Sequence, residues 1–231
     1  MDSLPPNYRS LVIGATGAIG AAFVQQLQAD ARCAQVLGLS RHSTPPIDFA
    51  DEQSVAAAAD SLADQGPFHL IVNAAGVLHG EHGLPEKRLA QIHYAQLEHT
   101  FRTNTFGPAL VLAHFAPLLD RQRSVLAMVS AKVGSIGDNR LGGWYSYRAS
   151  KAALNMLIKT ASIEVQRSNP AAVLVALHPG TVDSHLSAPF RGAEIGRPAA
   201  DAAADMLRVL DGLAPADTGG FFAYSGQALP W

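Results

Sequence analysis

Cysteine is almost absent from the sequence, and this excludes a disulfide-stabilised fold. Cys33 is the single cysteine among 231 residues, so no disulfide can form within the chain. A structural zinc site would also lack its usual thiolate ligands. We interpret Cys33 as a packing residue.

Charged residues are few and nearly balanced in sign. The chain has 17 Lys and Arg against 19 Asp and Glu, with a net charge of −2 and a pI near 6.5. This composition leaves no basic stripe for nucleic acid or for an anionic membrane surface. We therefore expect a small-molecule ligand, with neither a nucleic acid nor a membrane as partner.

Long apolar runs are also missing, although 48% of the residues are hydrophobic. The first residues, "MDSLPPNYRS", contain no basic segment followed by an apolar run, and no later stretch reaches membrane-spanning length. We expect a cytoplasmic protein. A chain of this length and hydrophobic content suits a single domain spanning residues 1–231.

Histidine is more frequent, with nine residues in the chain. His79 and His82 stand close together in "HGEHG", but the sequence shows no clustered set of further ligands around them. We interpret both as solvated loop residues and expect no metal.

Short apolar runs alternate with longer amphipathic segments. Strands are predicted at residues 10–14, 34–40, 68–76, 124–130, 172–180 and 219–226. The segments between them predict helices, including a long one over residues 94–119 that is interrupted near Gly107-Pro108. Repeated units of this kind predict an α/β fold with a doubly wound, mostly parallel sheet. Such sheets bind ligands at the carboxyl ends of their strands.

The glycine-rich segment "GATGAIG" lies between the first strand and the first helix, at Gly14 to Gly20. A backbone of this kind can approach a pyrophosphate at the amino end of a helix. The alternative is a tight turn that merely connects the strand to the helix.

Two tyrosines and a lysine share the predicted helix "WYSYRASKAALN". Tyr147 and Lys151 are four residues apart and lie on one helical face, whereas Tyr145 is turned away from Lys151. A nearby ammonium lowers the pKa of a phenol, which then exchanges protons more readily with an alcohol or carbonyl. By itself the pair is a weak motif, because a chance spacing is the alternative.

With "NAAG" at 73–76 and "PGTVDS" at 179–184, these motifs resemble the short-chain dehydrogenase/reductase family over nearly the whole chain. The stretch "GSIGDNRLGGWYSYRASKAALN" is further similar to its C-factor-like branch. The resemblance implies a single-domain Rossmann fold of about seven strands. It also implies an NAD(P)-dependent oxidoreductase that transfers a hydride between the nicotinamide and a carbonyl or secondary alcohol. The alternative is a dinucleotide-binding sensor or signalling protein with little turnover.

The resemblance also implies roles for individual residues. Tyr147 would be the general acid or base, Lys151 would hold the nicotinamide ribose and lower the tyrosine pKa, and Asn104 would steady a water that relays protons. Together with Tyr147 and Lys151, the residues expected to contact the coenzyme are Gly14, Thr16, Ala18, Ile19, Gly20, Ser40, Arg41, Asp48, Asn73, Ala74, Ala75, Gly76, Pro179, Gly180, Val182 and Ser184.

Ser40 and Arg41 stand where NAD-preferring relatives carry an acidic residue. Arg41 offers a charge-assisted partner for a 2′-phosphate, so we expect NADPH to be favoured, with NAD possible. A solvated loop arginine is the alternative. Ala18 occupies the position of the middle glycine in the family pattern.

The active-site serine of the family is missing. Its position, three residues before a glycine, is held by Ala131 in "VSAKVG". Ser130 is the candidate replacement, but neighbouring side chains of a strand point to opposite faces, so the backbone would have to twist there. Ser135 is the second candidate.

The helix after Lys151 is apolar on more than one side. Leu154, Leu157, Ile158, Ala161 and Val165 form one face, while Met156 and Ile163 lie on another. In the family that the sequence resembles, this helix and the preceding long one build dimers or tetramers, so we expect a homodimer or homotetramer. Trp144 and Tyr145 are candidate walls of an apolar pocket for a modest hydrophobic carbonyl or alcohol substrate.

Overall fold

Six parallel strands form one sheet in the order β2-β1-β3-β4-β5-β6, in a computed structural model that describes residues 1–231. Every neighbouring pair of strands is parallel. The central strands β3 and β4 are buried along their whole length because helices cover both of their faces. The strands are β1 (Tyr8–Ile13), β2 (Cys33–Leu39), β3 (Leu70–Asn73), β4 (Ser124–Val129), β5 (Ala172–His178) and β6 (Phe221–Ala223).

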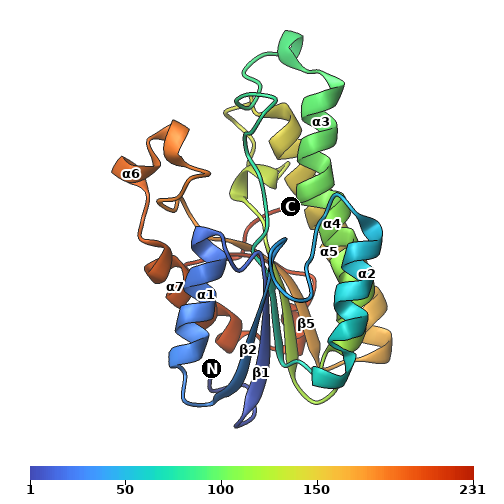
Figure 1. Ribbon diagram of the computed structural model, residues 1–231. Helices are drawn as coiled ribbons and strands as arrows, with labels where there is room; N and C mark the ends of the chain where they lie inside the picture. Colours follow the sequence, from blue (N-terminus) through green and yellow to red (C-terminus); the bar gives the residue numbers. More distant parts are fainter.

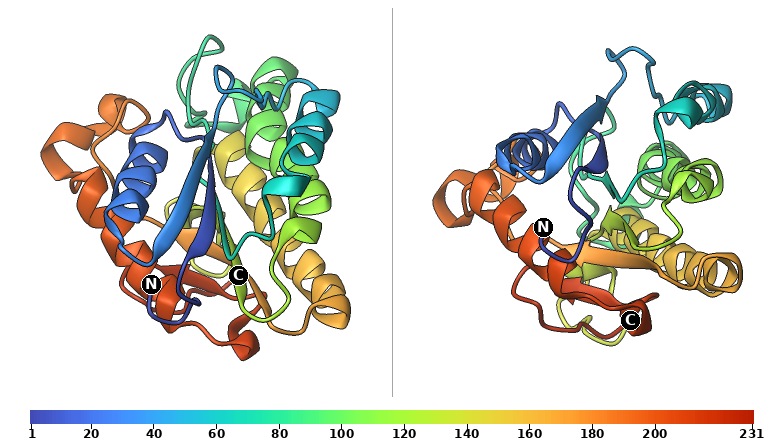
Figure 2. Two further views of the ribbon diagram at one scale, coloured as in Figure 1. Left: turned by 60° about the horizontal axis from the view of Figure 1, so that its bottom comes forward. Right: turned by 90° about the horizontal axis from the view of Figure 1, so that it is seen from below.

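Helices lie on both faces of this sheet (Figures 1 and 2). On one face are α1 (Ala18–Ala29) and α7 (Ala199–Gly212), where Phe23, Leu27 and Met206 are fully buried. On the other face are α2 (Glu52–Ser61), α4 (Gly107–Phe115) and α5 (Tyr145–Ser168), where Phe115 and Ile158 are fully buried. The predicted doubly wound α/β fold is confirmed.

The sheet has six strands where the resemblance implied about seven. After β2 the chain continues through residues 43–49 without pairing to the edge of the sheet. This stretch contains Pro45 and Pro46, which have no N–H groups to donate to a neighbouring strand. The edge therefore ends at β2.

The long helix predicted over residues 94–119 is interrupted a few residues earlier than expected. It consists of α3 (Tyr94–Phe101), a π-helical turn (Arg102–Phe106) and α4. Pro108 has no N–H for the Asn104 carbonyl, and its ring would crowd that carbonyl in an α-helix. The wider turn relieves this, and the Gly107 N–H bonds the Arg102 carbonyl instead.

The order of the strands reverses at β1, whose neighbours are β2 and β3. The connections that leave β1 and β3 therefore run to opposite faces, and α/β sheets bind their ligands at the carboxyl ends of the strands at such a point. The N-terminus lies toward the other end of the sheet, while α3 and α6 (Gly192–Ile195) lie beyond the carboxyl ends (Figure 1). None of the helices combines the length and the apolar character that crossing a membrane requires.

Candidate active site

The glycine loop closes against the turn that follows β3. Gly14 has φ +80°, which favours glycine, and a Cβ there would lie 2.7 Å from the Ala75 nitrogen. A Cβ on Gly20 would overlap the Gly14 carbonyl oxygen. Gly17 has more room, because the nearest atom to an added Cβ is 3.5 Å away. Close backbone approach therefore requires glycine at two of the three positions.

The amino end of α1 is open to solvent. Gly17 is its N-cap, and no side chain bonds the N–H groups of the first turn. Thr16, Gly17 and Ala18 are exposed, and Ile19 is half-buried. Unpaired N–H groups and the positive end of the helix dipole attract an anion. The loop therefore fits a pyrophosphate, and the exposed methyl group of Ala18 does not pack into the turn.

The end of β2 lies beside the glycine loop, because the Gly14 N–H donates to the Leu39 carbonyl at 2.9 Å. Ser40 follows directly and is half-buried, while Arg41 is exposed. Asp48 is farther along the chain, and its Oδ1 accepts a backbone N–H two residues on at 2.9 Å. The structure therefore places Ser40 and Arg41 next to the loop and leaves the Arg41 guanidinium free to meet a ligand.

The turn after β3 is braced by its own first residue. Asn73 is buried, and its Oδ1 accepts the Ala75 N–H at 3.1 Å. The Ala74 N–H donates to the Ile13 carbonyl at 2.8 Å, which ties this turn to the end of β1. Ala74, Ala75 and Gly76 are half-buried.

The π-helical turn directs Asn104 at the same segment. Its Oδ1 accepts the Val77 N–H at 2.9 Å, and its Nδ2 donates to the Val77 carbonyl at 2.8 Å. A Cβ on Gly76 would lie 3.3 Å from Asn104 Oδ1 and 3.5 Å from Lys151 Nζ. Asn104 and Lys151 thus both lie beside Gly76, and the missing side chain of this glycine leaves room between their polar groups.

Tyr147 and Lys151 are buried together in the first turns of α5, with 8% and 3% of their surfaces exposed. The Lys151 ammonium donates to the Val129 carbonyl at 3.0 Å, at the end of β4. It lies 5.9 Å from the centre of the Tyr147 ring. The four-residue spacing therefore brings the two side chains to the carboxyl ends of the central strands.

The pKa of Tyr147 is shifted in the direction opposite to the one expected from a neighbouring ammonium. Burial raises the pKa of Tyr147 above its ordinary value of 10. Burial also lowers the pKa of Lys151 from 10.5 to about 8. Removing both groups from water disfavours the charged form of each, which raises the pKa of the phenol and lowers that of the ammonium.

Ser130 does not take the position of the missing serine. Its Oγ donates to Asn155 Oδ1 at 2.7 Å, while Ala131 packs against Tyr147 and Leu78. Ala131 has φ −147° and ψ 142°, so the backbone stays extended. The side chains of Ser130 and Ala131 therefore point to opposite sides. The second candidate, Ser135, accepts a backbone N–H within its own turn at 3.1 Å. The choice of Ser130 as a catalytic residue is thus corrected.

The segment after β5 turns at Gly180 and continues into a short lid, residues 181–197. Gly180 has φ +78°, and a Cβ there would lie 2.8 Å from the Tyr224 ring. The two ends of the lid are joined by backbone hydrogen bonds. The Asp183 N–H donates to the Arg197 carbonyl and the Arg197 N–H donates to the Thr181 carbonyl, both at 2.9 Å.

Three residues of the "PGTVDS" segment have different surroundings at the base of the lid. Pro179 and Val182 are buried, while Ser184 is half-buried. The Ser184 Oγ donates to the Val182 carbonyl at 3.3 Å. The Ser184 hydroxyl, which was expected to meet the nicotinamide carboxamide, therefore bonds a carbonyl of the lid itself.

Apolar side chains surround the Tyr147 ring. Leu78 and Ala131 contact it, and Trp144, Leu186 and Phe190 pack around this cluster. The Trp144 and Phe190 rings lie 4.9 Å apart between their centres, so α5 meets the lid here. Trp144 therefore belongs to the apolar cluster around Tyr147, whereas Tyr145 does not.

Glu86 is a site residue that sequence reasoning missed. Glu86 is only 3% exposed, and its carboxylate accepts hydrogen bonds from both the N–H and the hydroxyl of Ser146. Ser146 directly precedes Tyr147, so Glu86 binds the first turn of the helix that carries the tyrosine. A single acidic residue in a loop carries no sequence signal, because only the fold brings it to α5.

The chain is similar to several known proteins. Residues 9–194 match the family model described as short chain dehydrogenase. The C-signal protein of Myxococcus xanthus is 39% identical over 168 residues, which cover 72% of this chain and 94% of that protein. The 1-hydroxy-2-glutathionyl-2-methyl-3-butene dehydrogenase of Rhodococcus sp. is 32% identical over 188 residues, covering 81% and 79%.

A solved structure is also similar. The NADPH-bound carbonyl reductase from chicken fatty liver superposes with a TM-score of 0.84 and 26% sequence identity. The superposition covers 99% of this chain and 96% of the reductase. The likeness therefore extends over the whole fold.

Replacing Lys151 by Met should make stability less dependent on pH. The Lys151 pKa is about 8 in the folded chain and ordinarily 10.5, so between these values the unfolded chain binds more protons. The free energy of unfolding of the wild type therefore rises as pH increases from about 8 to 10.5, and this gain is lost again as pH falls back toward 8. From pH 7 to 9.5 we expect wild type to gain about 2 kcal/mol relative to Lys151→Met. Denaturant unfolding at both pH values measures this; parallel pH profiles would contradict it.

Proposed function

The chain belongs to the short chain dehydrogenase family, and from this premise we propose that it is an NAD(P)-dependent oxidoreductase acting on a small apolar carbonyl or alcohol. The observation that carries the proposal is the burial of Tyr147 beside Lys151 at the carboxyl ends of the central strands. This is where an α/β sheet binds its ligands. A protein that only senses a dinucleotide has no need for a proton donor at this point.

The chain's own residues fit a nicotinamide dinucleotide. The glycine loop and the uncapped first turn of α1 would hold the pyrophosphate, because glycine at positions 14 and 20 lets the backbone fold tightly and leaves the N–H groups of the first turn unpaired. The turn from Asn73 to Gly76 would face the adenosine, and Lys151 would hold the nicotinamide ribose. Residues 179–184 would close over the nicotinamide. When bound, the dinucleotide supplies or accepts the hydride.

Tyr147 would supply the proton. Burial raises its pKa, so the phenol holds the proton that carbonyl reduction requires, and releasing that proton would depend on the Lys151 ammonium stabilising the phenolate. Lys151, with a pKa of about 8, is close enough to neutrality to pass a proton on. Asn104, which lies with Lys151 beside Gly76, would steady the water that relays protons to the lysine, and the lid would keep bulk solvent away from the site.

The proposed substrate is apolar. Leu78, Trp144, Leu186 and Phe190 form the walls around Tyr147, and Ala131 adds a methyl group beside it. A pocket of this kind places a ketone or aldehyde by burying its hydrocarbon part, with the tyrosine hydroxyl as the polar contact.

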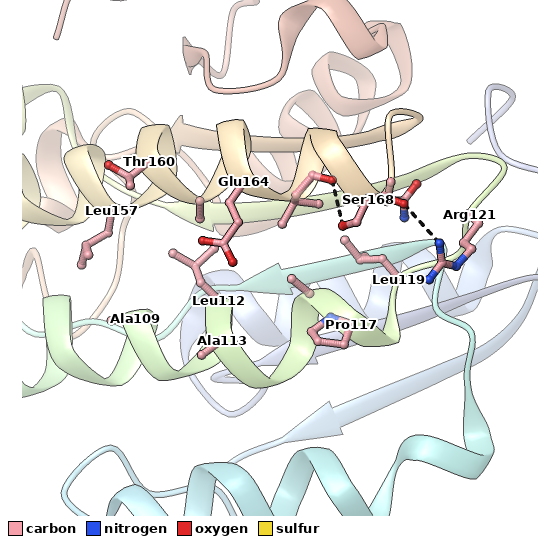
Figure 3. A pocket seen from close by; sticks show the side chains of 14 residues that line it. Ala109, Leu112, Ala113, Pro117, Leu119, Arg121, Leu157, Thr160, Glu164 and Ser168 are labelled. Carbon is pink, nitrogen blue, oxygen red and sulfur yellow. Dashed lines mark hydrogen bonds between the residues drawn. The ribbon is translucent and has the colours of Figure 1, made fainter.

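We also propose that the protein is a homo-oligomer. A groove of about 490 Å³ lies between α4 and α5, away from the candidate active site (Figure 3). Small side chains line it, including Ala109, Ala113 and Ala161, and they allow another backbone to approach closely. Met156 and Ile163 on α5 are 66% and 49% exposed. A second copy of the chain would cover these apolar residues.

The test of the proposed function is Tyr147→Phe. Its ring would pack in the same way but could not donate a proton, so we expect kcat to fall at least about 100-fold while dinucleotide affinity is unchanged. Tyr145→Phe is the matched control and should keep most of the activity. Turnover of a ketone and aldehyde panel is followed at the nicotinamide absorbance. Full activity of Tyr147→Phe, or no turnover by wild type with any carbonyl, would contradict the proposal.

Coenzyme preference tests the role of Arg41. We expect wild type to have a higher kcat/KM with NADPH than with NADH, because the guanidinium would pair with the 2′-phosphate. Arg41→Ala should lower kcat/KM for NADPH about tenfold and leave the value for NADH nearly unchanged. A preference for NADH in the wild type would overturn this assignment.

The alanine beside Tyr147 leads to a gain-of-function test. With Ser130 bonded to Asn155, no serine hydroxyl lies at the position where the family carries one. Restoring the donor in Ala131→Ser should raise kcat about tenfold or more, since such donors stabilise charge on the substrate oxygen. Ala149→Ser, on the exposed side of α5, is the control. An unchanged kcat would show that another group already supplies this hydrogen bond.

The proposed oligomer is tested by placing a charged side chain in the groove between α4 and α5. Ala113→Arg would place a guanidinium in the apolar groove between α4 and α5, so we expect the variant to be a monomer where the wild type is a dimer or tetramer. Ala95→Arg, on the exposed surface of α3, should leave the assembly intact. Light scattering after gel filtration measures the mass of each. A monomeric wild-type protein would contradict the proposal.

A further inference from the structure

Three potential metal ligands meet outside the candidate active site. Glu81 and His82 lie at the tip of the loop after β3, and His99 lies on α3. Their ligand atoms all fall within 4.8 Å of one another. The His82 Nε2 is 3.3 Å from Glu81 Oε1, and the His82 and His99 ring centres are 5.4 Å apart. The fold thus supplies the further ligand that the sequence pattern around His82 lacked.

The loop is shaped to present these groups to α3. Gly80 and Gly83 exchange backbone hydrogen bonds of 3.3 and 3.0 Å, which makes a tight turn with Glu81 and His82 between them. Gly83 has φ +102°, a conformation that side chains strain. A Cβ on Gly80 would lie 3.2 Å from His99 Nε2, so a glycine there lets the imidazole reach the loop.

We propose that Glu81, His82 and His99 bind one divalent transition-metal ion, for which Zn²⁺ is the natural probe. Imidazole nitrogen and carboxylate oxygen are ligands that zinc prefers, and two histidines with one glutamate form a known zinc ligand set. Tetrahedral ligands at about 2.1 Å from zinc are about 3.4 Å apart, close to the Glu81–His82 distance. The third ligand would come from the half-buried His99, whose ring nitrogen lies within 4.8 Å of the other two ligand atoms. Water would fill the fourth position.

His79, the other histidine of the "HGEHG" segment, points elsewhere. Its Nε2 lies 3.2 Å from the His185 carbonyl, and its ring lies against His185 and Phe190 of the lid. His79 is therefore not a ligand of this site, although it lies close to His82 in the sequence. The partner of His82 comes from α3.

A metal at this point would join the loop after β3 to α3. The inner parts of the same loop place Leu78 against Tyr147 and Glu86 against Ser146. The ion would thus restrain the outer end of a loop whose inner end lines the candidate active site. It would stabilise the fold by mass action without touching the reacting groups.

Titration of the chelator-treated wild-type protein with zinc chloride tests the proposal. We expect calorimetry to show one Zn²⁺ bound per chain at this site and the Tm to rise with zinc concentration. His99→Ala and His82→Ala should each weaken zinc binding at least tenfold and abolish the zinc-dependent rise in Tm. His82 is exposed at the loop tip, so that variant keeps the test valid if His99→Ala fails to fold.

His185→Ala is the matched control, because His185 is an exposed histidine of the neighbouring lid. It should bind zinc as wild type does, and Mg²⁺ should leave the Tm of all four proteins unchanged because it prefers oxygen ligands. Zinc binding that survives His82→Ala would overturn the proposal, as would a loss of binding in His185→Ala. Absence of any zinc binding to wild type would overturn it as well.

Discussion

The backbone contact between the glycine loop and the turn after β3 is the constraint on which the site depends. Because the strand order reverses at β1, the chains leaving β1 and β3 diverge and would otherwise leave a gap. Gly14 closes it by meeting the backbone of Ala75, an approach that no side chain permits. This contact brings the uncapped amino end of α1 and the Asn73 turn to the same edge of the sheet.

Burial is the second organising effect, and it acts on both ionisable groups of the site. Lys151 is anchored to the end of β4 through Val129, and Tyr147 is enclosed by α5, the loop after β3 and the lid. In water the two charges would attract only weakly; away from water each loses its hydration. The enclosed state therefore favours a neutral phenol.

The alternation of apolar and amphipathic segments was enough to predict the fold, because each parallel strand and its covering helix produce a local pattern. The four-residue spacing likewise placed Tyr147 and Lys151 together, since helical geometry is local. Three features needed the folded chain: the direction of the Tyr147 pKa shift, the orientation of Ser130, and the meeting of Glu86 with Ser146. Each depends on contacts between segments far apart in sequence or on a backbone angle that composition does not reveal.

The π-helical turn at Arg102–Phe106 sets the angular relation between two otherwise ordinary helices. It inserts one extra residue per turn, and one residue of α-helix corresponds to a rotation of about 100°. The turn therefore rotates α3 about the helix axis relative to α4. The apolar side of α4 stays on the sheet, while α3 presents a different side to the loop after β3. A chain that lost one residue here would keep both helices and most of the core, yet His99 and the loop it faces would no longer be aligned. Length in this segment is thus as constrained as residue type.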